Sequence, residues 1–130
     1  MKQIEGWWDS DLSPHLEVFT PDNESLDLVV DSGFNGELML SVSLIKKLNL
    51  KRRGFINNQL ADGAIVAVKT YVGEIFWFGQ RKRVLIQATN SDEGLLGTEL
   101  FKGCKIELDP DAGQVLFRKK STKTRKGLLK

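Results

Sequence analysis

The strongest constraint on the fold of this chain is the run at residues 64–78, which is rich in valine, isoleucine, tyrosine and phenylalanine. Branched and aromatic side chains of this kind favour β-strands. The pair Asp62-Gly63 directly before the run is typical of a hairpin turn, and Gly79-Gln80 after it predicts a second tight turn. Phe55 and Ile56 lead into the first turn, and the second turn leads into residues 83–86. The middle of the chain is therefore predicted to be β-structure.

Shorter patterns on either side extend this β-structure. Strands are predicted where apolar residues alternate or form short buried runs, at residues 15–19, 26–30, 106–108 and 115–117. Ser41 can cap a short helix that ends near Lys47. Residues 98–102 can form a single helical turn that ends at Gly103. Together these patterns predict a mostly β, barrel-like domain with one or two short helices.

The size and composition of the chain are those of one globular domain. Its 130 residues include 41% hydrophobic and 28% charged side chains, so a core can form without a disulfide framework. We predict three parts: an N-terminal extension at residues 1–13, the folded domain at residues 14–117 and a tail at residues 118–130.

The net charge of +2 is unevenly distributed along the chain. The tail holds seven Lys or Arg and no acid, which leaves 12 basic and 17 acidic side chains, a net charge of −5, over residues 1–117. A basic tail can bind nucleic acid or an anionic surface, but no aromatic side chain lies among these charges to stack on bases. We therefore expect a solvated, disordered tail and no nucleic-acid partner, with binding through the tail left open.

Membrane association and secretion are not expected from this sequence. No segment is long and apolar enough to span a bilayer, and residues 1–9 lack the apolar stretch of a secretory signal. The single cysteine, Cys104, fits a reducing compartment or a small buried apolar side chain. These features predict a cytoplasmic protein.

One carboxylate occupies a position that calls for a chemical explanation. Asp31 ends the apolar run at residues 26–30 and is followed at once by the turn-forming Ser32 and Gly33. A carboxylate at the end of a buried strand is costly unless it is hydrogen-bonded, ligates a metal or shares a proton. The hydroxyl of Ser32 and the backbone amide of Gly33 are both placed to donate to it, and glycine allows close approach of another backbone.

The sequence Asp31-Ser32-Gly33 resembles the Asp-Thr/Ser-Gly signature of aspartic proteases. Farther along the chain, Leu95-Leu96-Gly97 resembles the hydrophobic-hydrophobic-Gly element whose strand threads beside the catalytic loop in that family. Residues 98–101 resemble the short helix that follows. Over residues 14–117 the chain is similar to the compact bacterial and archaeal aspartic proteases of clan AA. The resemblance implies a retropepsin-like closed barrel, equivalent to half of a pepsin-like enzyme.

The resemblance also implies an activity and an oligomeric state. Aspartic proteases hydrolyse peptide bonds with a water molecule held between two carboxylates that share one proton. Since the chain contains one Asp-Ser-Gly element, the second Asp31 must come from a twofold-related copy. We therefore expect a homodimeric aspartic endopeptidase acting on a peptide or protein substrate. The alternative is an inactive module of the same fold that binds a partner without cutting it.

Enzymes of this family close a β-hairpin flap over the substrate, and the turn at Ala61, Asp62 and Gly63 is the matching segment here. Gly63 would give the tip flexibility, and its backbone would hydrogen-bond a bound peptide. An ordinary Asp-Gly hairpin turn without a ligand explains the same residues equally well.

Other reactive side chains form no comparable pattern. His15 is the only histidine, which argues against a Ser-His-Asp triad and a histidine-rich metal site. Because it follows Pro14 at the start of a predicted strand, we expect a surface role for it. Asp109 and Asp111 flank a proline and are explained by turn formation. With no zinc-ligand spacing and no phosphate-binding glycine loop, no metal or cofactor is expected.

Overall fold

The computed structural model describes residues 2–121, and these residues form a mostly β fold. Its strands are β1 (Gln3–Glu5), β2 (Trp7–Trp8), β3 (Pro14–Phe19), β4 (Ser25–Val30), β5 (Leu38–Ser41), β6 (Lys51–Gln59), β7 (Ile65–Trp77), β8 (Gln80–Thr89), β9 (Gly94–Leu96), β10 (Cys104–Asp109) and β11 (Gln114–Lys119). The helical segments are α1 (Val42–Lys47) and the 3-10 turn η1 (Thr98–Leu100). Among these elements, no helix has the length and apolar character needed to cross a membrane.

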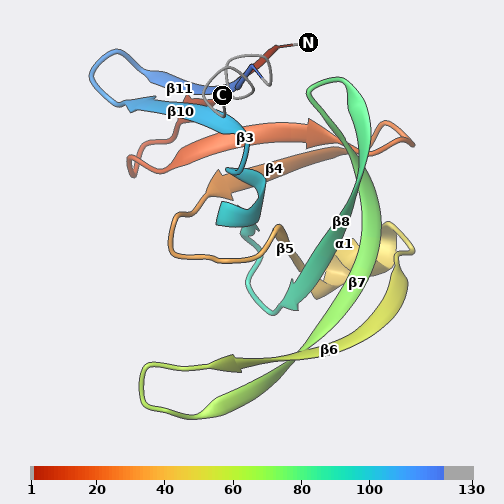
Figure 1. Cartoon of the computed structure of the whole chain (residues 1–130). Coiled ribbons are helices and arrows are strands. Elements are labelled where there is room, and N and C mark those ends of the chain that lie inside the picture. The colour runs from red at the N-terminus through yellow and green to blue at the C-terminus, as the bar shows by residue number, and fades with distance from the viewer. Residues whose placement is uncertain (1, 122–130) are drawn as a thin grey trace, which may run out of the picture.

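The strands are arranged in two sheets (Figure 1). The smaller sheet has the order β1-β11-β10, and the larger has the order β2-β3-β4-β9-β5-β8-β7-β6. The long strands β6, β7 and β8 curve through the larger sheet, and the β6–β7 hairpin extends away from the rest of the molecule (Figure 1). Most pairs are antiparallel, but β4 with β9 and β5 with β8 are parallel.

A single apolar core joins both sheets to α1 and η1. Its most completely enclosed apolar side chains are Leu16, Leu26, Leu28, Leu38, Leu40, Ile75, Val84, Leu96, Leu100, Val115 and Phe117. Phe117 of β11 connects the smaller sheet to β7 and to the residue after η1. Its ring makes edge-to-face contacts with Trp77 and Phe101 at centroid distances of 5.9 and 5.8 Å. The prediction of a mostly β domain with short helices is confirmed.

The short helix begins where the sequence predicts. The Ser41 hydroxyl accepts a hydrogen bond from the backbone N–H of Leu44 at 3.1 Å, and the helix ends at Lys47. This bond satisfies one of the amides that the first turn of a helix leaves without an intrahelical partner. Ile45 anchors the helix in the core.

The turn between β7 and β8 differs by one residue from the prediction. Trp77 lies opposite Gln80, so the turn residues are Phe78 and Gly79 rather than Gly79 and Gln80. Their φ angles of 52° and 79° are both positive, as in the type I′ turn that suits a twisted hairpin. The buried ring of Phe78 explains why a residue other than glycine occupies the first position.

The N-terminal residues are part of both sheets. In the segment assigned from sequence to an extension at residues 1–13, β1 pairs with β11 and β2 pairs with β3. Gly6 joins the two strands, and its N–H donates to the carbonyl of Val115 at 2.8 Å. A Cβ atom at Gly6 would lie 1.8 Å from the carbonyl oxygen of His15, so only glycine permits this crossing. At the other end, β11 runs through Lys119, and residues 122–130 of the predicted tail lie outside the described residues.

Candidate active site

Asp31 lies at the end of β4, where the chain leaves the larger sheet. Its backbone N–H donates to the carbonyl of Leu96 at 3.0 Å, which continues the pairing between β4 and β9 by one residue. Its carboxylate oxygen Oδ1 accepts a hydrogen bond from the N–H of Gly33 at 2.8 Å. The side chain is half-buried. Asp31 is therefore held by one hydrogen bond from its backbone and one to its carboxylate, while the side chain remains partly accessible to solvent.

The 95–97 element lies beside the strand that leads into Asp31. β9 lies between β4 and β5, with Leu95 opposite Val29 in a parallel pair and Leu96 opposite Leu38 in an antiparallel one. Gly97 follows, and its N–H donates to the carbonyl of Glu37 at 2.8 Å. The strand entering the Asp31 loop and the strand leaving it are thus joined through β9.

The loop after Asp31 is closely packed because two glycines meet there. A Cβ atom on Gly97 would lie 2.2 Å from the carbonyl oxygen of Gly36, and one on Gly36 would lie 2.6 Å from the ring of Phe34. The N–H of Thr98 donates to the Phe34 carbonyl at 2.9 Å, and that of Glu99 to the Gly36 carbonyl at 3.2 Å. The loop backbone is therefore fixed by the residues that follow β9.

Ser32 differs from the sequence-based expectation. Within residues 2–121, no hydrogen bond joins its hydroxyl to the Asp31 carboxylate, and the N–H of Gly33 makes that contact alone. The physical reason is the position of Ser32, which is exposed to solvent in the turn. In the single chain, only one of the two predicted donors contacts Asp31.

The predicted flap segment forms the tip of the β6–β7 hairpin. The N–H of Leu60 donates to the carbonyl of Ala64 at 2.7 Å, and the N–H of Ala64 donates to Oδ1 of Asp62 at 2.9 Å. Gly63 has a φ of 88°, a conformation that favours glycine. Ala61 completes the turn and, like its neighbours, is exposed.

A cleft of about 580 Å³ lies between this hairpin and the loop after Asp31. It is lined by Gly33, Phe34, Asn35, Gly36, Ile56, Asn57, Asn58, Gln59, Leu60 and Gln87. The amide of Asn58 donates to Oε1 of Gln87 at 3.4 Å and so connects β6 to β8 across the cleft. A volume of this size suits a ligand of several residues or a small molecule.

The cleft-lining residues of β6 were missed in the sequence. Alternation along the strand places Ile56 and Asn58 on one side of the hairpin, but the sequence does not indicate which side meets the Asp31 loop. Gln87 was missed because the strand predicted at residues 83–86 stopped one residue before it, whereas β8 continues to Thr89. Gln87 lies opposite Met39 in the parallel pair of β5 and β8, and these two strands are far apart in the sequence.

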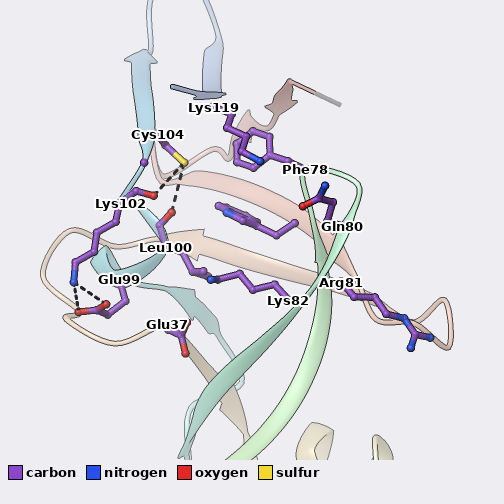
Figure 2. A pocket seen from close by; sticks show the side chains of 12 residues that line it. Glu37, Phe78, Gln80, Arg81, Lys82, Glu99, Leu100, Lys102, Cys104 and Lys119 are labelled. Atoms are coloured by element: carbon purple, nitrogen blue, oxygen red, sulfur yellow. Dashed lines mark hydrogen bonds and ion pairs between the residues drawn. The ribbon is translucent and has the colours of Figure 1, made fainter. Parts of the chain in front are cut away.

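A second cleft, of about 500 Å³, lies elsewhere and contains neither Asp31 nor the tip of the β6–β7 hairpin (Figure 2). Its lining includes Arg81, Lys82 and the ion pair between Lys102 and Glu99, whose atoms are 2.9 Å apart. The thiol of Cys104 borders it, and burial raises the pKa of that thiol. A raised pKa disfavours the reactive thiolate, so this cleft is a weaker candidate for catalysis.

Comparison with known proteins supports the fold. The chain is similar to the EIAV protease solved in complex with the inhibitor HBY-793, with a TM-score of 0.61 and 15% sequence identity. The similarity covers 78% of this chain and 98% of that protease. The fold is retropepsin-like. No protein-family model matches the chain, and no curated protein matches it in sequence.

The retropepsin-like fold is shared with a retroviral protease, whereas the sequence resemblance pointed to compact bacterial and archaeal enzymes. At 15% identity the likeness establishes the fold alone. A fold supports many activities, so the function has to be argued from Asp31 and its surroundings.

Proposed function

We propose that this chain is the protomer of a homodimeric aspartic endopeptidase in which the Asp31 carboxylates of two copies activate one water molecule. The observation that carries the proposal is the position of Asp31. It ends a buried strand, its carboxylate accepts the N–H of Gly33 at 2.8 Å, and the adjoining cleft opens beneath a long hairpin. A carboxylate fixed in this way is suited to proton transfer in a substrate complex.

The dimer follows from the chemistry. One carboxylate must take a proton from water while a second, protonated one polarises the peptide carbonyl, and two carboxylates in contact share a single proton. Each chain supplies one Asp31 with the Asp-Ser-Gly context. The second carboxylate therefore comes from another copy, with the site on the twofold axis. Ser32 and Gly33 position the loop on each side of that axis.

The hairpin would act as the flap. Its tip at Ala61, Asp62 and Gly63 is exposed, and its inner side borders the cleft through Ile56 and Asn58. An extended peptide bound in the cleft would find backbone hydrogen-bonding groups on the hairpin above it. The substrate is accordingly a peptide or an extended protein segment. A cytoplasmic location and kinship with the compact bacterial and archaeal enzymes belong to the same proposal.

The test combines mass and activity. Light scattering measures the mass of the wild type, Asp31→Asn and the control Asp111→Asn, whose substitution lies in the exposed turn between β10 and β11. Each protein is then incubated with a mixed peptide library from about pH 3 to about pH 8, a range that spans the ordinary pKa values of Asp and His. We expect a dimer, cleavage by the wild type and the control, and no cleavage by Asp31→Asn at unchanged mass.

Two results would contradict the proposal. Cleavage by Asp31→Asn at the wild-type rate would show that another group carries the reaction. A wild-type monomer that cuts no peptide at any pH would instead favour the alternative, a retropepsin-like module that binds a partner without hydrolysing it.

A further inference from the structure

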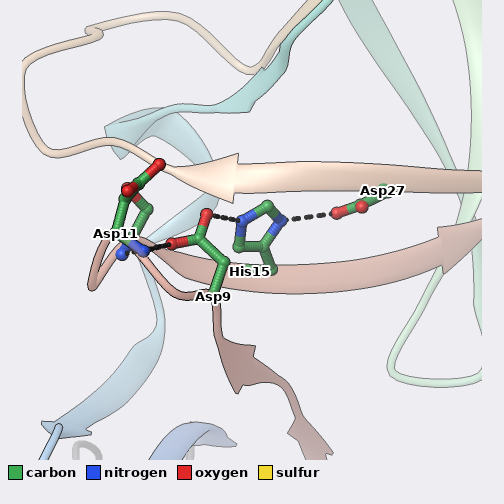
Figure 3. Close-up of polar contacts among 5 residues, drawn as sticks. Asp9, Asp11, His15 and Asp27 are labelled. Atoms are coloured by element: carbon green, nitrogen blue, oxygen red, sulfur yellow. Dashed lines mark hydrogen bonds and ion pairs between the residues drawn. The ribbon is translucent and has the colours of Figure 1, made fainter.

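The only histidine of the chain lies between two carboxylates (Figure 3). Ring atom Nε2 of His15 is 2.7 Å from Oδ2 of Asp9, and Nδ1 is 2.7 Å from Oδ1 of Asp27. The His15 side chain is only 13% exposed. His15 lies on the outer face of β3, opposite in direction to the buried Leu16, but Trp7 and the two carboxylates cover most of its ring.

Asp9 also fixes the turn in which it lies. Its other carboxylate oxygen, Oδ1, accepts the backbone N–H groups of Asp11 at 2.9 Å and Ser13 at 3.0 Å. One carboxylate thus connects the turn between β2 and β3 to the ring of His15. Since Asp27 belongs to β4, the three side chains link the N-terminal segment to two strands of the larger sheet.

This geometry requires a charged ring. A neutral imidazole has one N–H and one lone pair, whereas the imidazolium has two N–H groups. Carboxylates accept hydrogen bonds and do not donate when ionised. With a carboxylate at each ring nitrogen, both bonds of His15 form only in the protonated state. A neutral His15 would leave either Asp9 or Asp27 facing a lone pair.

The surrounding groups favour that state. Burial by itself lowers the pKa of His15, but the hydrogen bonds to Asp9 and Asp27 outweigh it, so the pKa is raised above its ordinary value of 6.5. The hydrogen bond to His15 is the main cause that lowers the pKa of Asp9 below 3.8. A further acidic group on the same face of β3 is Glu17, whose carboxylate accepts a hydrogen bond from the hydroxyl of Ser25.

Two uncharged side chains of the described residues also lie beside the ring. From β2, Trp7 stacks on His15 with a centroid distance of 5.3 Å and an interplanar angle of 16°. From β4, Val29 lies opposite His15. Charge on the ring is therefore controlled by Asp9 and Asp27, with Glu17 as a more distant acidic neighbour.

The three residues lie on the side of the sheet that carries Asp31. Residues opposite one another in a sheet share a face, so Trp7, His15, Val29 and Leu95 form one row across β2, β3, β4 and β9. Val29 precedes Asp31 by two positions and hence points to the same side. Because β2 is the edge strand next to β3, this face of the sheet includes β2 only while the N-terminal segment stays paired with β3.

We propose that Asp9, His15 and Asp27 form a pH-dependent clasp that holds the segment at residues 7–13 along the edge of β3, with its contacts on the side of the sheet that carries Asp31. The clasp closes when the ring is charged and both carboxylates are ionised. When it opens, Trp7 leaves the ring of His15 and the edge of β3 is uncovered. This inference does not depend on the proposed protease activity.

The pH range of the clasp follows from the two shifts. Because the pKa of His15 is raised by folding, its contribution is fully present below 6.5 and is lost as the pH rises through the folded-state value. Because the pKa of Asp9 is lowered, its contribution is present above 3.8 and is lost as the pH falls through its folded-state value. The clasp is therefore most stable between these two ordinary values and opens as the pH rises through the folded-state pKa of His15.

Nuclear magnetic resonance of the full chain tests the clasp directly, because a single histidine gives one set of ring signals. We expect the His15 ring to titrate with a midpoint above 6.5. Hydrogen exchange at the amides of Asp11 and Ser13, corrected with an unstructured reference peptide, should accelerate with the same midpoint. In Asp27→Asn the ring midpoint should fall, while in the matched control Glu17→Gln both midpoints should stay with those of the wild type.

A second variant separates the clasp from general loosening of the fold. In His15→Gln, the pH-dependent step in exchange at Asp11 and Ser13 should disappear, while Leu28 and Leu96 in the core keep their protection. If that variant does not fold, Asp27→Asn supplies the same comparison. A ring midpoint at or below 6.5, or an exchange step that persists unchanged in Asp27→Asn, would overturn the proposal.

Discussion

Replacing Gly97 with alanine should destabilise the fold by crowding the loop that holds Asp31. Gly97 has a φ of −100° and a ψ of 177°, which alanine adopts without strain. The new methyl group, however, would lie 2.2 Å from the carbonyl oxygen of Gly36 and 2.7 Å from that of Phe34. An ordinary contact begins at 3.4 Å, so the Gly36 oxygen would have to move by about 1.2 Å, the difference between 3.4 and 2.2 Å.

That movement has two costs. Overpacking of this kind costs about 1–3 kcal/mol. The displaced carbonyls of Gly36 and Phe34 also accept the N–H groups of Glu99 and Thr98, and each weakened hydrogen bond contributes about 1 kcal/mol. We expect a total loss of about 3–5 kcal/mol, which lowers the melting temperature by about 12–20 °C for a domain of this size.

Urea unfolding followed by circular dichroism measures this loss, with Gly94→Ala, at the start of the strand that precedes Gly97, as the control. At Gly94 the nearest atom is a methyl carbon of Leu28 at 3.0 Å, and the nearest backbone atom, the carbonyl oxygen of Asp27, is at 3.2 Å, so the backbone would have to move only by about 0.2 Å to reach an ordinary contact of 3.4 Å. We expect that control to lose about 1 kcal/mol. If Gly97→Ala loses no more stability than Gly94→Ala, backbone contact does not hold the Asp31 loop and the reasoning is wrong.

Two further substitutions test the rest of the fold. Ser41→Ala should lower the free energy of unfolding by about 1 kcal/mol, because the first turn of α1 loses its side-chain cap; Ser41→Asp, which keeps an acceptor, should retain most of that stability in the same urea titration. Phe117→Ala should cost about 3–5 kcal/mol, because the fully buried ring contacts both Trp77 and Phe101. A loss below about 1 kcal/mol would show that the smaller sheet does not depend on this ring.

The features predicted correctly from sequence are those encoded by neighbouring residues. The cap at Ser41 and the turn at Asp62-Gly63 depend on side chains within a few positions of one another, and both form as expected. The turn after Trp77 was misplaced by one residue because Phe78 gives no local sign that it adopts a positive φ. Its burial in the core, which favours that conformation, is set by strands elsewhere in the chain.

The features that were missed depend on long-range pairing. β1 pairs with β11, which lies at the opposite end of the described chain, and no pattern within residues 1–13 indicates that partner. The carboxylates beside His15 come from a turn and from a neighbouring strand. The alternation of apolar residues along β3 therefore gives no sign of them. The Asp31-Ser32-Gly33 signature could be recognised in the sequence because it resembles a motif of a known protein family. The cleft beside Asp31 could not be predicted from the sequence, because it forms only when the β6–β7 hairpin folds over the loop after Asp31.

The parallel pairing of β4 with β9 has a consequence for the order in which this chain is built. Val30 and Leu96, which lie opposite each other in that pair, are 66 positions apart (96 − 30). Contacts between such distant segments form slowly, since a long loop must close first, and a ribosome releases the N-terminal part of a chain before the rest. The carbonyls of Phe34 and Gly36 cannot form their hydrogen bonds until the amides of Thr98 and Glu99 have been synthesised. A growing chain therefore carries its aspartate long before it has a loop that can hold it in place.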